Sequence, residues 1–301
     1  METQYSFELF PPKTEKGMEK LKGVVTELNA LEPAYFSVTY GAGGSTRERT
    51  FATVDWLRGQ GIDTAPHLSC IGAGREEILD ILNRYRNEGI RRIVALRGDL
   101  PSGAGLGGLG EFNYANELVA FINANFPGEF HIEVAAYPEF HPQAESAWKD
   151  LDNFQRKVEA GAHGAITQYF YNADAYWRFV EDCEHRGIEI PIVPGIMPIT
   201  NYVNLARFSD ACGAEIPRWL CKRLEAYGED LESIFDFGVD VVSDLCARLL
   251  DNGAPGLHFY TMNQSAAVKA IWSRLGLDFV VKLLFLQLLK LSLFHYLKEA
   301  S

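Results

Sequence analysis

The sequence predicts an α/β protein in which eight parallel strands close into a single (β/α)8 barrel, the TIM-barrel fold. Eight short apolar runs recur along the chain, and each is followed by a stretch whose apolar residues have helical spacing. Polar and charged residues gather where the apolar runs end, as they do at the carboxyl ends of barrel strands. No shift in composition marks a linker, so we expect residues 1–277 to form one catalytic barrel.

The first half of the chain shows this alternation clearly. The first apolar run stops at Pro11-Pro12, because proline cannot continue a strand ladder. Ser45 and Thr46 follow the glycine run after the second strand, and they are the expected N-caps of the next helix. The expected strands here are 5–10, 34–40, 64–70 and 92–98, and the expected helices are 14–31, 45–58 and 75–88.

The second half keeps the same order, with one longer interval. Residues 202–250 are rich in helical patterns, so we expect extra helices before the last strand. A doubly wound open sheet is the structural alternative, but it usually carries a glycine fingerprint after its first strand, where this chain has Pro11-Pro12-Lys13. The expected strands are 131–137, 164–170, 191–196 and 257–261, and the expected helices are 114–126, 145–160, 174–186 and 265–275.

Residues 278–301 have a different character from the barrel sequence. They are mostly Leu, Phe and Val, and their polar residues are spread over several helical faces. Two lysines interrupt a run that is barely long enough to cross a bilayer, so a membrane span is disfavoured. We expect an apolar helix that docks on the barrel or on another subunit of a homo-oligomer, and we assign no function to it.

The bulk composition excludes several classes of function. The chain has 28 basic and 40 acidic residues and a formal charge of -12, which argues against a nucleic-acid-binding protein. Its five cysteines are widely spaced without a CxxC pair, which is typical of reduced thiols. No secretion signal is visible, and no two histidines have metal-ligand spacing. We therefore expect a cytoplasmic protein that binds no metal.

Residues at the expected strand ends indicate acid–base chemistry. Glu8 ends the first strand and Asp99 follows the fourth, so a barrel would direct two carboxyl groups into one cavity. Burial and mutual repulsion favour the neutral form of one carboxyl, so an acid and a base can coexist. Phe7 and Leu9 flank Glu8 and predict an apolar setting for it. The other polar residues at these ends are Thr39, Tyr40, His67, Arg97, Tyr137, His141, Gln168, Tyr169, Tyr260 and Asn263.

Taken singly, these residues also have ordinary structural interpretations. An Asp after Arg-Gly, such as Asp99, often serves as a turn residue or a helix cap. His67 could be a hydrogen-bonded core histidine. The glycine run 103–110 is not in GxGxxG register after a strand, so on its own it predicts only a loop. The interpretation as an active site therefore depends on the whole set.

Eight of these segments occur together, and in this order, in one enzyme family. They are 7–13 (FELFPPK), 37–45 (SVTYGAGGS), 66–70 (PHLSC), 96–101 (LRGDLP), 136–142 (AYPEFHP), 167–170 (TQYF), 194–198 (PGIMP) and 258–263 (HFYTMN). Over residues 5–275 the chain resembles methylenetetrahydrofolate reductase, a FAD-dependent barrel enzyme of one-carbon metabolism. The resemblance implies that NADH or NADPH reduces methylenetetrahydrofolate to methyltetrahydrofolate with ping-pong kinetics, which supplies methyl groups for methionine synthesis.

The resemblance also implies a role for each matching position. Glu8 corresponds to the general acid, and Asp99 corresponds to the carboxylate beside the flavin and the pterin. The implied folate-side or nicotinamide-side contacts are Gln168, Phe208, Thr39 and Tyr260. The implied FAD contacts are Thr39, His67, Arg97, Gly98, Asp99, Tyr137, His141, Asp150 and Lys157.

Some features depart from the family pattern, and two other functions stay open. Gln264 stands where some bacterial members have a basic residue, and the glycine run 103–110 has no counterpart. One alternative is a barrel aldolase or isomerase that uses Glu8 and Asp99 without flavin. The other is a folate- or flavin-binding protein with a silent active site.

Overall fold

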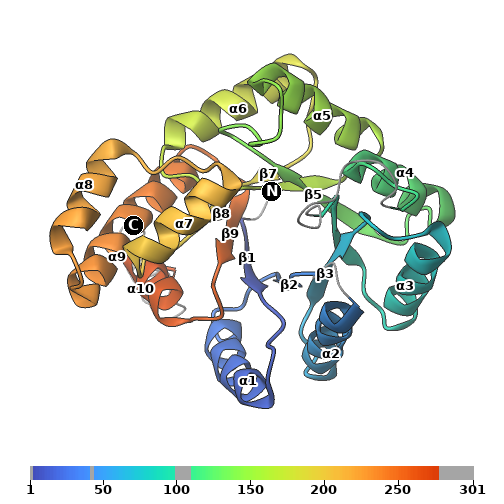
Figure 1. Ribbon diagram of the computed structural model, residues 1–301, viewed down its shortest axis with the longest axis horizontal. Coiled ribbons are helices and arrows are strands. Elements are labelled where there is room, and N and C mark those ends of the chain that lie inside the picture. Colours follow the sequence, from blue (N-terminus) through green and yellow to red (C-terminus); the bar gives the residue numbers. More distant parts are fainter. Residues whose placement is uncertain (1–2, 41–43, 99–109, 278–301) are drawn as a thin grey trace, which may run out of the picture.

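The computed structural model describes residues 3–40, 44–98 and 110–277, which form a barrel of parallel strands surrounded by helices (Figure 1). The strands are β1 (Gln4–Leu9), β2 (Tyr35–Val38), β3 (Thr64–Ser69), β4 (Arg92–Leu96), β5 (His131–Ala136), β6 (Gly164–Thr167), β7 (Ile192–Val193), β8 (Gly195–Ile196) and β9 (Gly256–Tyr260). The helices are α1 (Glu15–Asn29), α2 (Gly44–Gly59), α3 (Arg75–Asn87), α4 (Ala115–Asn125), α5 (Ala147–Glu159), α6 (Ala173–His185), α7 (Tyr202–Cys212), α8 (Arg218–Tyr227), α9 (Leu231–Asp251) and α10 (Ala266–Arg274). The predicted (β/α)8 architecture is confirmed.

The barrel closes at a break in its seventh strand. Only Pro194 separates β7 from β8, yet β7 pairs with β6 while β8 pairs with β9 on the other side. Proline has no N–H group to donate, so the ladder changes partner at this residue. The carbonyl of Pro194 still accepts the His258 N–H at 3.0 Å. The predicted strand 191–196 is therefore present as two short strands that join opposite edges of the sheet.

Extra helices occupy the interval where the sequence predicted them. α7, α8 and α9 lie between β8 and β9 in the chain, and Figure 1 places them together on one side of the barrel. One local prediction is wrong: α2 begins at Gly44, so Ser45 and Thr46 lie inside the helix rather than at its N-cap. Capping residues mark a helix start only to within one or two positions, which explains the difference.

Apolar packing between strands and helices holds the barrel. Phe7, Phe36 and Phe259 are completely buried on the outer faces of their strands. The ring of Phe7 packs against Trp272 of α10 at 6.0 Å between centroids. Burying each such ring contributes about 1.5–3 kcal/mol. The apolar cluster inside the barrel is much smaller and consists of Tyr35, Ala65, Val94 and Ile166, with Leu96 and Tyr260 at its edge.

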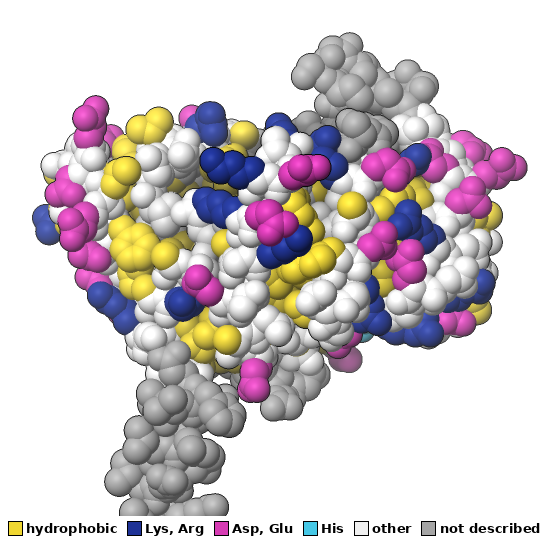
Figure 2. Space-filling view, turned by 90° about the horizontal axis from the view of Figure 1, so that it is seen from below, with side chains coloured by type: hydrophobic (Ala, Val, Ile, Leu, Met, Phe, Trp, Pro, Cys, Tyr) yellow, Lys and Arg dark blue, Asp and Glu magenta, His cyan; other side chains and the backbone are white. Residues whose placement is uncertain are grey.

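The outer surface mixes both signs of charge with apolar patches. Figure 2 shows this mixture on the face that includes α1 and α2. Some opposite charges pair, such as Arg84 with Asp55 at 2.8 Å and Lys269 with Glu27 at 3.0 Å. Exposed pairs of this kind contribute only about 0–1 kcal/mol, so the core carries the fold. In the part of the chain that the structure describes, no helix has the length and apolar character of a membrane span.

Candidate active site

The residues implicated by sequence gather at the carboxyl ends of the strands, which share one rim because all strands are parallel. Glu8 lies near the end of β1, Thr39 follows β2, His67 lies in β3, Arg97 and Gly98 follow β4, Tyr137 and His141 follow β5, Gln168 follows β6, and Tyr260 ends β9. Phe208 lies on α7, whereas Asp150 and Lys157 lie on α5. Asp99, residues 103–109 and the segment 278–301 lie outside the described residues. No cluster of His, Cys, Asp or Glu suited to a metal ion occurs within the described ranges.

Glu8 is the acidic group of a buried polar cluster inside the barrel. Its side chain is only 7 % exposed, and its Oε2 atom lies 3.4 Å from Nε2 of His67. His258 of β9 places its own Nε2 atom 3.9 Å from the same oxygen. Burial lowers the pKa of His67, and the charge of Glu8 opposes this shift. Because a lowered pKa favours the uncharged ring, His67 is a neutral neighbour of Glu8 at pH 7.

The setting of Glu8 differs from the apolar one expected from its neighbours in sequence. Phe7 and Leu9 belong to the core between the strands and the helices, while Glu8 points to the interior of the barrel. Successive strand residues face opposite sides, so the flanking residues do not surround Glu8. Its surroundings are mainly imidazole and hydroxyl groups. The carboxyl group is therefore buried in a polar site rather than in an apolar one.

Tyr260 spans the rim from β9 to β6. Its hydroxyl group donates to the carbonyl of Thr167 at 2.7 Å. The ring can cross here because Gly195 has no side chain, and a Cβ atom at that position would lie 2.1 Å from the same carbonyl oxygen. Burial raises the pKa of Tyr260 well above its usual value, and the charge of Glu8 adds to this effect. The phenol therefore stays a neutral hydrogen-bond donor at physiological pH.

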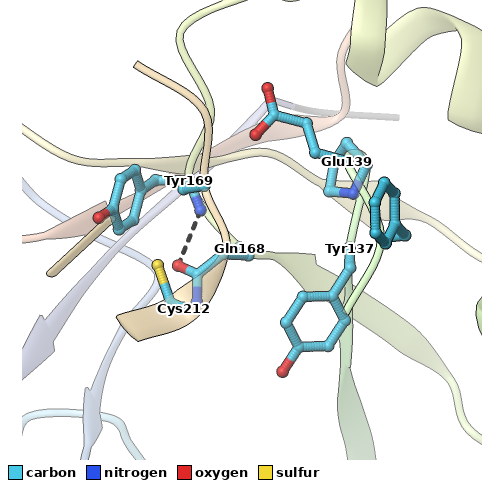
Figure 3. Close-up of a pocket in the computed structure, with 9 residues that line it drawn as sticks. Tyr137, Glu139, Gln168, Tyr169 and Cys212 are labelled. Carbon is cyan, nitrogen blue, oxygen red and sulfur yellow. Dashed lines mark hydrogen bonds between the residues drawn. The ribbon is translucent and has the colours of Figure 1, made fainter. Parts of the chain in front are cut away.

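Gln168 lies beside a small pocket formed by the loops after β5 and β6 and by α7 (Figure 3). Its Oε1 atom accepts the N–H of Tyr169 at 3.0 Å, the dashed line in the figure. The hydroxyl groups of Tyr169 and Ser209 are hydrogen-bonded at 2.9 Å, which ties the helix carrying Phe208 to this strand end. The pocket volume of about 10 Å³ suits a single water molecule.

A second group of residues links the ends of β4 and β5 to α5. Arg97 donates from Nη2 to Gln143 Oε1 at 2.6 Å, and the N–H of Gln143 donates to Nδ1 of His141 at 3.0 Å. The N–H of His141 donates to Asp150 at 2.9 Å. The ring of Tyr137 meets that of His141 edge-on, at 4.7 Å between centroids. The structure thus brings four of the implicated residues into one connected patch.

Lys157 belongs to the same patch but lies deeper, where α5 packs against β5. Its amino group donates to the carbonyl of Ala135. Loss of hydration lowers the pKa of Lys157 to about 8, and the charge of Asp150 acts in the opposite direction. Burial also raises the pKa of Asp150, against the hydrogen bond from His141 and the charge of Lys157. A poorly hydrated cation of this kind is stabilised by an anionic neighbour.

We expect the stability of the protein relative to its Lys157→Met variant to increase as the pH rises from about 8 to 10.5. The pKa of Lys157 is about 8 in the folded chain and has an ordinary value of 10.5. Between these values the unfolded chain binds the extra proton, so stability rises with pH. Below pH 8 Lys157 is charged in both the folded and the unfolded chain, so the difference in stability between the two proteins should not change with pH. Urea unfolding of both proteins over this range measures it, and a difference independent of pH would contradict the assignment.

Gly98 fixes the backbone at the end of β4, and we expect Gly98→Ala to destabilise the protein. Gly98 has a φ of +88°, and a Cβ atom there would lie 1.8 Å from Oγ of Ser69. The backbone strain alone costs about 1–3 kcal/mol, and Ser69 would also lose its hydrogen bond to the Arg97 carbonyl. Gly187→Ala is the matched control, because Gly187 has a φ of +72° with open space around it. Thermal unfolding should place Gly98→Ala clearly below this control, and equal melting temperatures would refute the argument.

Sequence reasoning assigned no role to Ser6, Ser37, Gln143 or His258. The first two share the inner face of the barrel with Glu8 and His258. A signal was present for Ser6, because it stands two residues before Glu8 and strand residues with that spacing point the same way. Its contact with His258 could not be read from the sequence, since 252 residues separate the pair. Gln143 lies in a loop, where no periodic pattern predicts the direction of a side chain.

The barrel geometry is shared with solved structures of low sequence similarity. An uncharacterized protein from Clostridium thermocellum that binds two copies of 5-methyl-5,6,7,8-tetrahydrofolic acid superposes with a TM-score of 0.63 and 16% identity. The match covers 91% of this chain and 93% of that chain. At this level of identity the likeness concerns the fold alone.

Sequence comparison is more specific. The family profile described as methylenetetrahydrofolate reductase matches residues 1–276. The 5,10-methylenetetrahydrofolate reductases of Salmonella typhimurium and Escherichia coli are 41% and 40% identical over 272 residues, which is 90% of this chain and 90% of each relative. The probable methylenetetrahydrofolate reductase (NADH) of Oryza sativa is a longer protein. It is 37% identical to this chain, and the match covers 91% of this chain and 48% of the rice protein. The chain belongs to the methylenetetrahydrofolate reductase family.

Proposed function

We propose that this protein reduces 5,10-methylenetetrahydrofolate to 5-methyltetrahydrofolate, with FAD as the bound cofactor and NADH or NADPH as the reductant. Its family membership supports the reaction. The single observation that carries the proposal is the position of Glu8, a buried carboxyl group at the rim of the barrel with imidazole nitrogens 3.4 and 3.9 Å from one of its oxygens. A buried acid at this place is what the chemistry of the substrate requires.

The reaction needs a proton donor because the methylene carbon of the substrate bridges two nitrogens. The five-membered ring opens to an iminium ion when the leaving nitrogen receives a proton. Glu8 is the residue that delivers this proton. A general acid at such a step contributes roughly 10²–10⁴-fold to the rate. Asp99 is the carboxylate that stabilises the resulting positive charge.

Residues at several strand ends of the same rim hold the substrate. Gln168 and Thr39 contact the pterin and the reacting region, and Tyr260, paired with Glu8 in the sheet, adds an aromatic ring beside it. Phe208 offers an aromatic face, which is 36% exposed on α7. Such a face suits the planar rings of folate or nicotinamide. Under ping-pong kinetics these two ligands bind one after the other.

The patch after β4 and β5 suits the flavin cofactor. A diphosphate needs charged donors, and Arg97 and Lys157 supply positive charge there against the acidic average of the chain. The lowered pKa of Lys157 supports this fit, because a nearby anion would stabilise its poorly hydrated ammonium form. When bound, FAD supplies the hydride-transfer chemistry between the nicotinamide and the folate. The full set of proposed contacts is Thr39, His67, Arg97, Gly98, Asp99, Tyr137, His141, Asp150 and Lys157.

The wider role follows from the same reaction. We place residues 1–277 in one catalytic barrel that associates as a homo-oligomer, and we assign no function to residues 278–301, which lie outside the described residues. The product would supply methyl groups for methionine synthesis in the cytoplasm. The acidic chain needs only small-molecule partners for this role.

An absorption spectrum tests the proposal directly. The purified protein, reconstituted with FAD, should show the flavin band at about 450 nm. Anaerobic NADH or NADPH should bleach it, and 5,10-methylenetetrahydrofolate should restore it. The better of the two reductants identifies the physiological one. Protein that stays colourless after reconstitution would overturn the proposal, and a flavin that folate never reoxidises would favour a binding protein with a silent site.

A further inference from the structure

We infer that His258 is a positioning residue for Glu8. Its imidazole ring, fixed by Ser6, supports the Oε2 atom of the carboxyl group from inside the barrel and leaves the Oε1 atom for the substrate. The inference rests on the proposed function, because it concerns the proton donor of that reaction. It assigns a task to a fully buried histidine to which the proposed function gives none.

Both ring nitrogens of His258 face oxygen atoms. Nδ1 is hydrogen-bonded to Oγ of Ser6 at 2.7 Å. Nε2 lies 3.5 Å from Oγ of Ser37 and 3.9 Å from Oε2 of Glu8. When the Ser6 hydroxyl donates to Nδ1, the ring proton resides on Nε2, which faces Glu8. The Nε2 edge of the ring therefore faces the Ser37 hydroxyl, its hydrogen-bond partner, and approaches one particular oxygen of Glu8 without a hydrogen bond.

Aromatic side chains on two strands hold the plane of this ring. Tyr35 of β2 stacks on it with centroids 6.3 Å apart and planes inclined by 28°. Tyr260 of β9 meets it edge-on at 5.4 Å and 85°. Tyr35 is also hydrogen-bonded to Ser6, so the same hydroxyl links both rings. The imidazole is thus restrained in position and in orientation.

Strand register brings these groups together. In the parallel ladder of β1 and β9, Ser6 is paired with His258 and Glu8 with Tyr260. Ser6 and Glu8 point to the inside because residues two apart share a face. Gly256 is paired with Gln4 two residues earlier, and a Cβ atom there would lie 1.8 Å from the Gln4 carbonyl oxygen. The close pairing at Gly256 therefore sets the height of His258 relative to Glu8.

A purely structural role accounts poorly for this histidine. The interiors of such barrels are usually filled by bulky branched apolar residues, which cost nothing to desolvate. A polar group in the same place is costly unless it is hydrogen-bonded. Here Ser6, Ser37 and His258 form a buried polar layer around Glu8, in which Ser37 is paired with Glu8 and His258 with Ser6. Maintaining such a layer is explained by the one carboxyl group that it supports.

The test compares His258→Leu with His258→Gln in the FAD-loaded protein. Leucine keeps volume alone, whereas the glutamine side chain can still offer an N–H group toward Glu8. Reduction of the flavin by NADH or NADPH should match the wild type in both, because that step needs no proton from Glu8. Reoxidation by 5,10-methylenetetrahydrofolate should fall at least about tenfold in His258→Leu, with part of the rate rescued in His258→Gln.

A second measurement reads the carboxyl group without cofactor or turnover. The infrared carbonyl band that disappears in Glu8→Gln reports the protonated acid of Glu8 in the flavin-free protein. The frequency of this band, read at one acidic pH, reports the surroundings of the carboxyl group, so it should shift in His258→Leu, where the imidazole 3.9 Å from Oε2 is lost. Ser6→Ala removes only the hydrogen bond to Nδ1 of His258 and keeps the imidazole ring, so it should shift the band less. The other groups of the described structure that face Glu8 or His258 are His67, Tyr35, Ser37 and Tyr260, and all four stay unchanged.

The outcomes separate the inference from the proposed function. An unchanged band and unchanged reoxidation in His258→Leu would overturn the inference, and so would an equal loss in both half-reactions accompanied by a lower melting temperature. If His258→Leu fails to fold, the same comparison in His258→Gln and Ser6→Ala decides. Failure of the proposed function would be seen earlier, as wild-type protein loaded with FAD that folate cannot reoxidise.

Discussion

Replacing Glu8 by glutamine should nearly abolish folate reduction and leave flavin reduction by NADH or NADPH intact. Glutamine has almost the same shape, so it can occupy the space beside His67 and His258 without a cavity. It has no acidic proton to give to the leaving nitrogen of the substrate. The expected loss in the folate half-reaction is about 10²–10⁴-fold, the usual contribution of a general acid.

Anaerobic stopped-flow absorbance measures the two half-reactions of the Glu8→Gln variant separately. Glu139→Gln is the matched control, because Glu139 is a partly buried carboxyl group on the same rim. Its pKa is raised by burial, and it accepts the N–H of Glu215 at 2.7 Å. The control should retain both half-reactions. Folate reduction within a few-fold of the wild type in Glu8→Gln would show that another group supplies the proton.

Gly256→Ala should cost the protein a large part of its stability. The new Cβ atom would lie 1.8 Å from the Gln4 carbonyl oxygen, which belongs to the backbone of the neighbouring strand. Backbone in a ladder cannot rotate away as a side chain can, so β1 and β9 must separate. We expect a loss of about 3 kcal/mol, the upper part of the usual range for overpacking.

Urea unfolding of Gly256→Ala measures this loss, and Gly23→Ala provides the control. Gly23 lies inside α1 with nothing near its missing Cβ atom, so alanine there should add about 0.5–1 kcal/mol of stability. Because β1 also carries Glu8, the folded fraction of Gly256→Ala should reduce folate more slowly than the wild type. Equal unfolding midpoints for Gly256→Ala and the wild type would refute the close approach of β1 and β9.

Much of the candidate site follows from local sequence patterns, and part of it does not. The residues at the strand ends were predictable, since an apolar run shows where a strand stops and parallel strands share one rim. The links from Arg97 through Gln143 to His141 were not, because they depend on how two loops meet. The polar setting of Glu8 was also missed. Its neighbours in sequence face the helices, while its neighbours in space come from β3 and β9.

The sequence alone determined the barrel class, the extra helices before the last strand and the family, because periodicity and short motifs are local properties of the chain. Only the tertiary structure decided that the seventh strand divides at Pro194 to close the barrel. It also decided that His258 lies against Ser6 and under Glu8. Strand register is the physical reason, since a contact between residues 252 positions apart depends on how backbones pair across the sheet and on where a missing Cβ atom lets them approach.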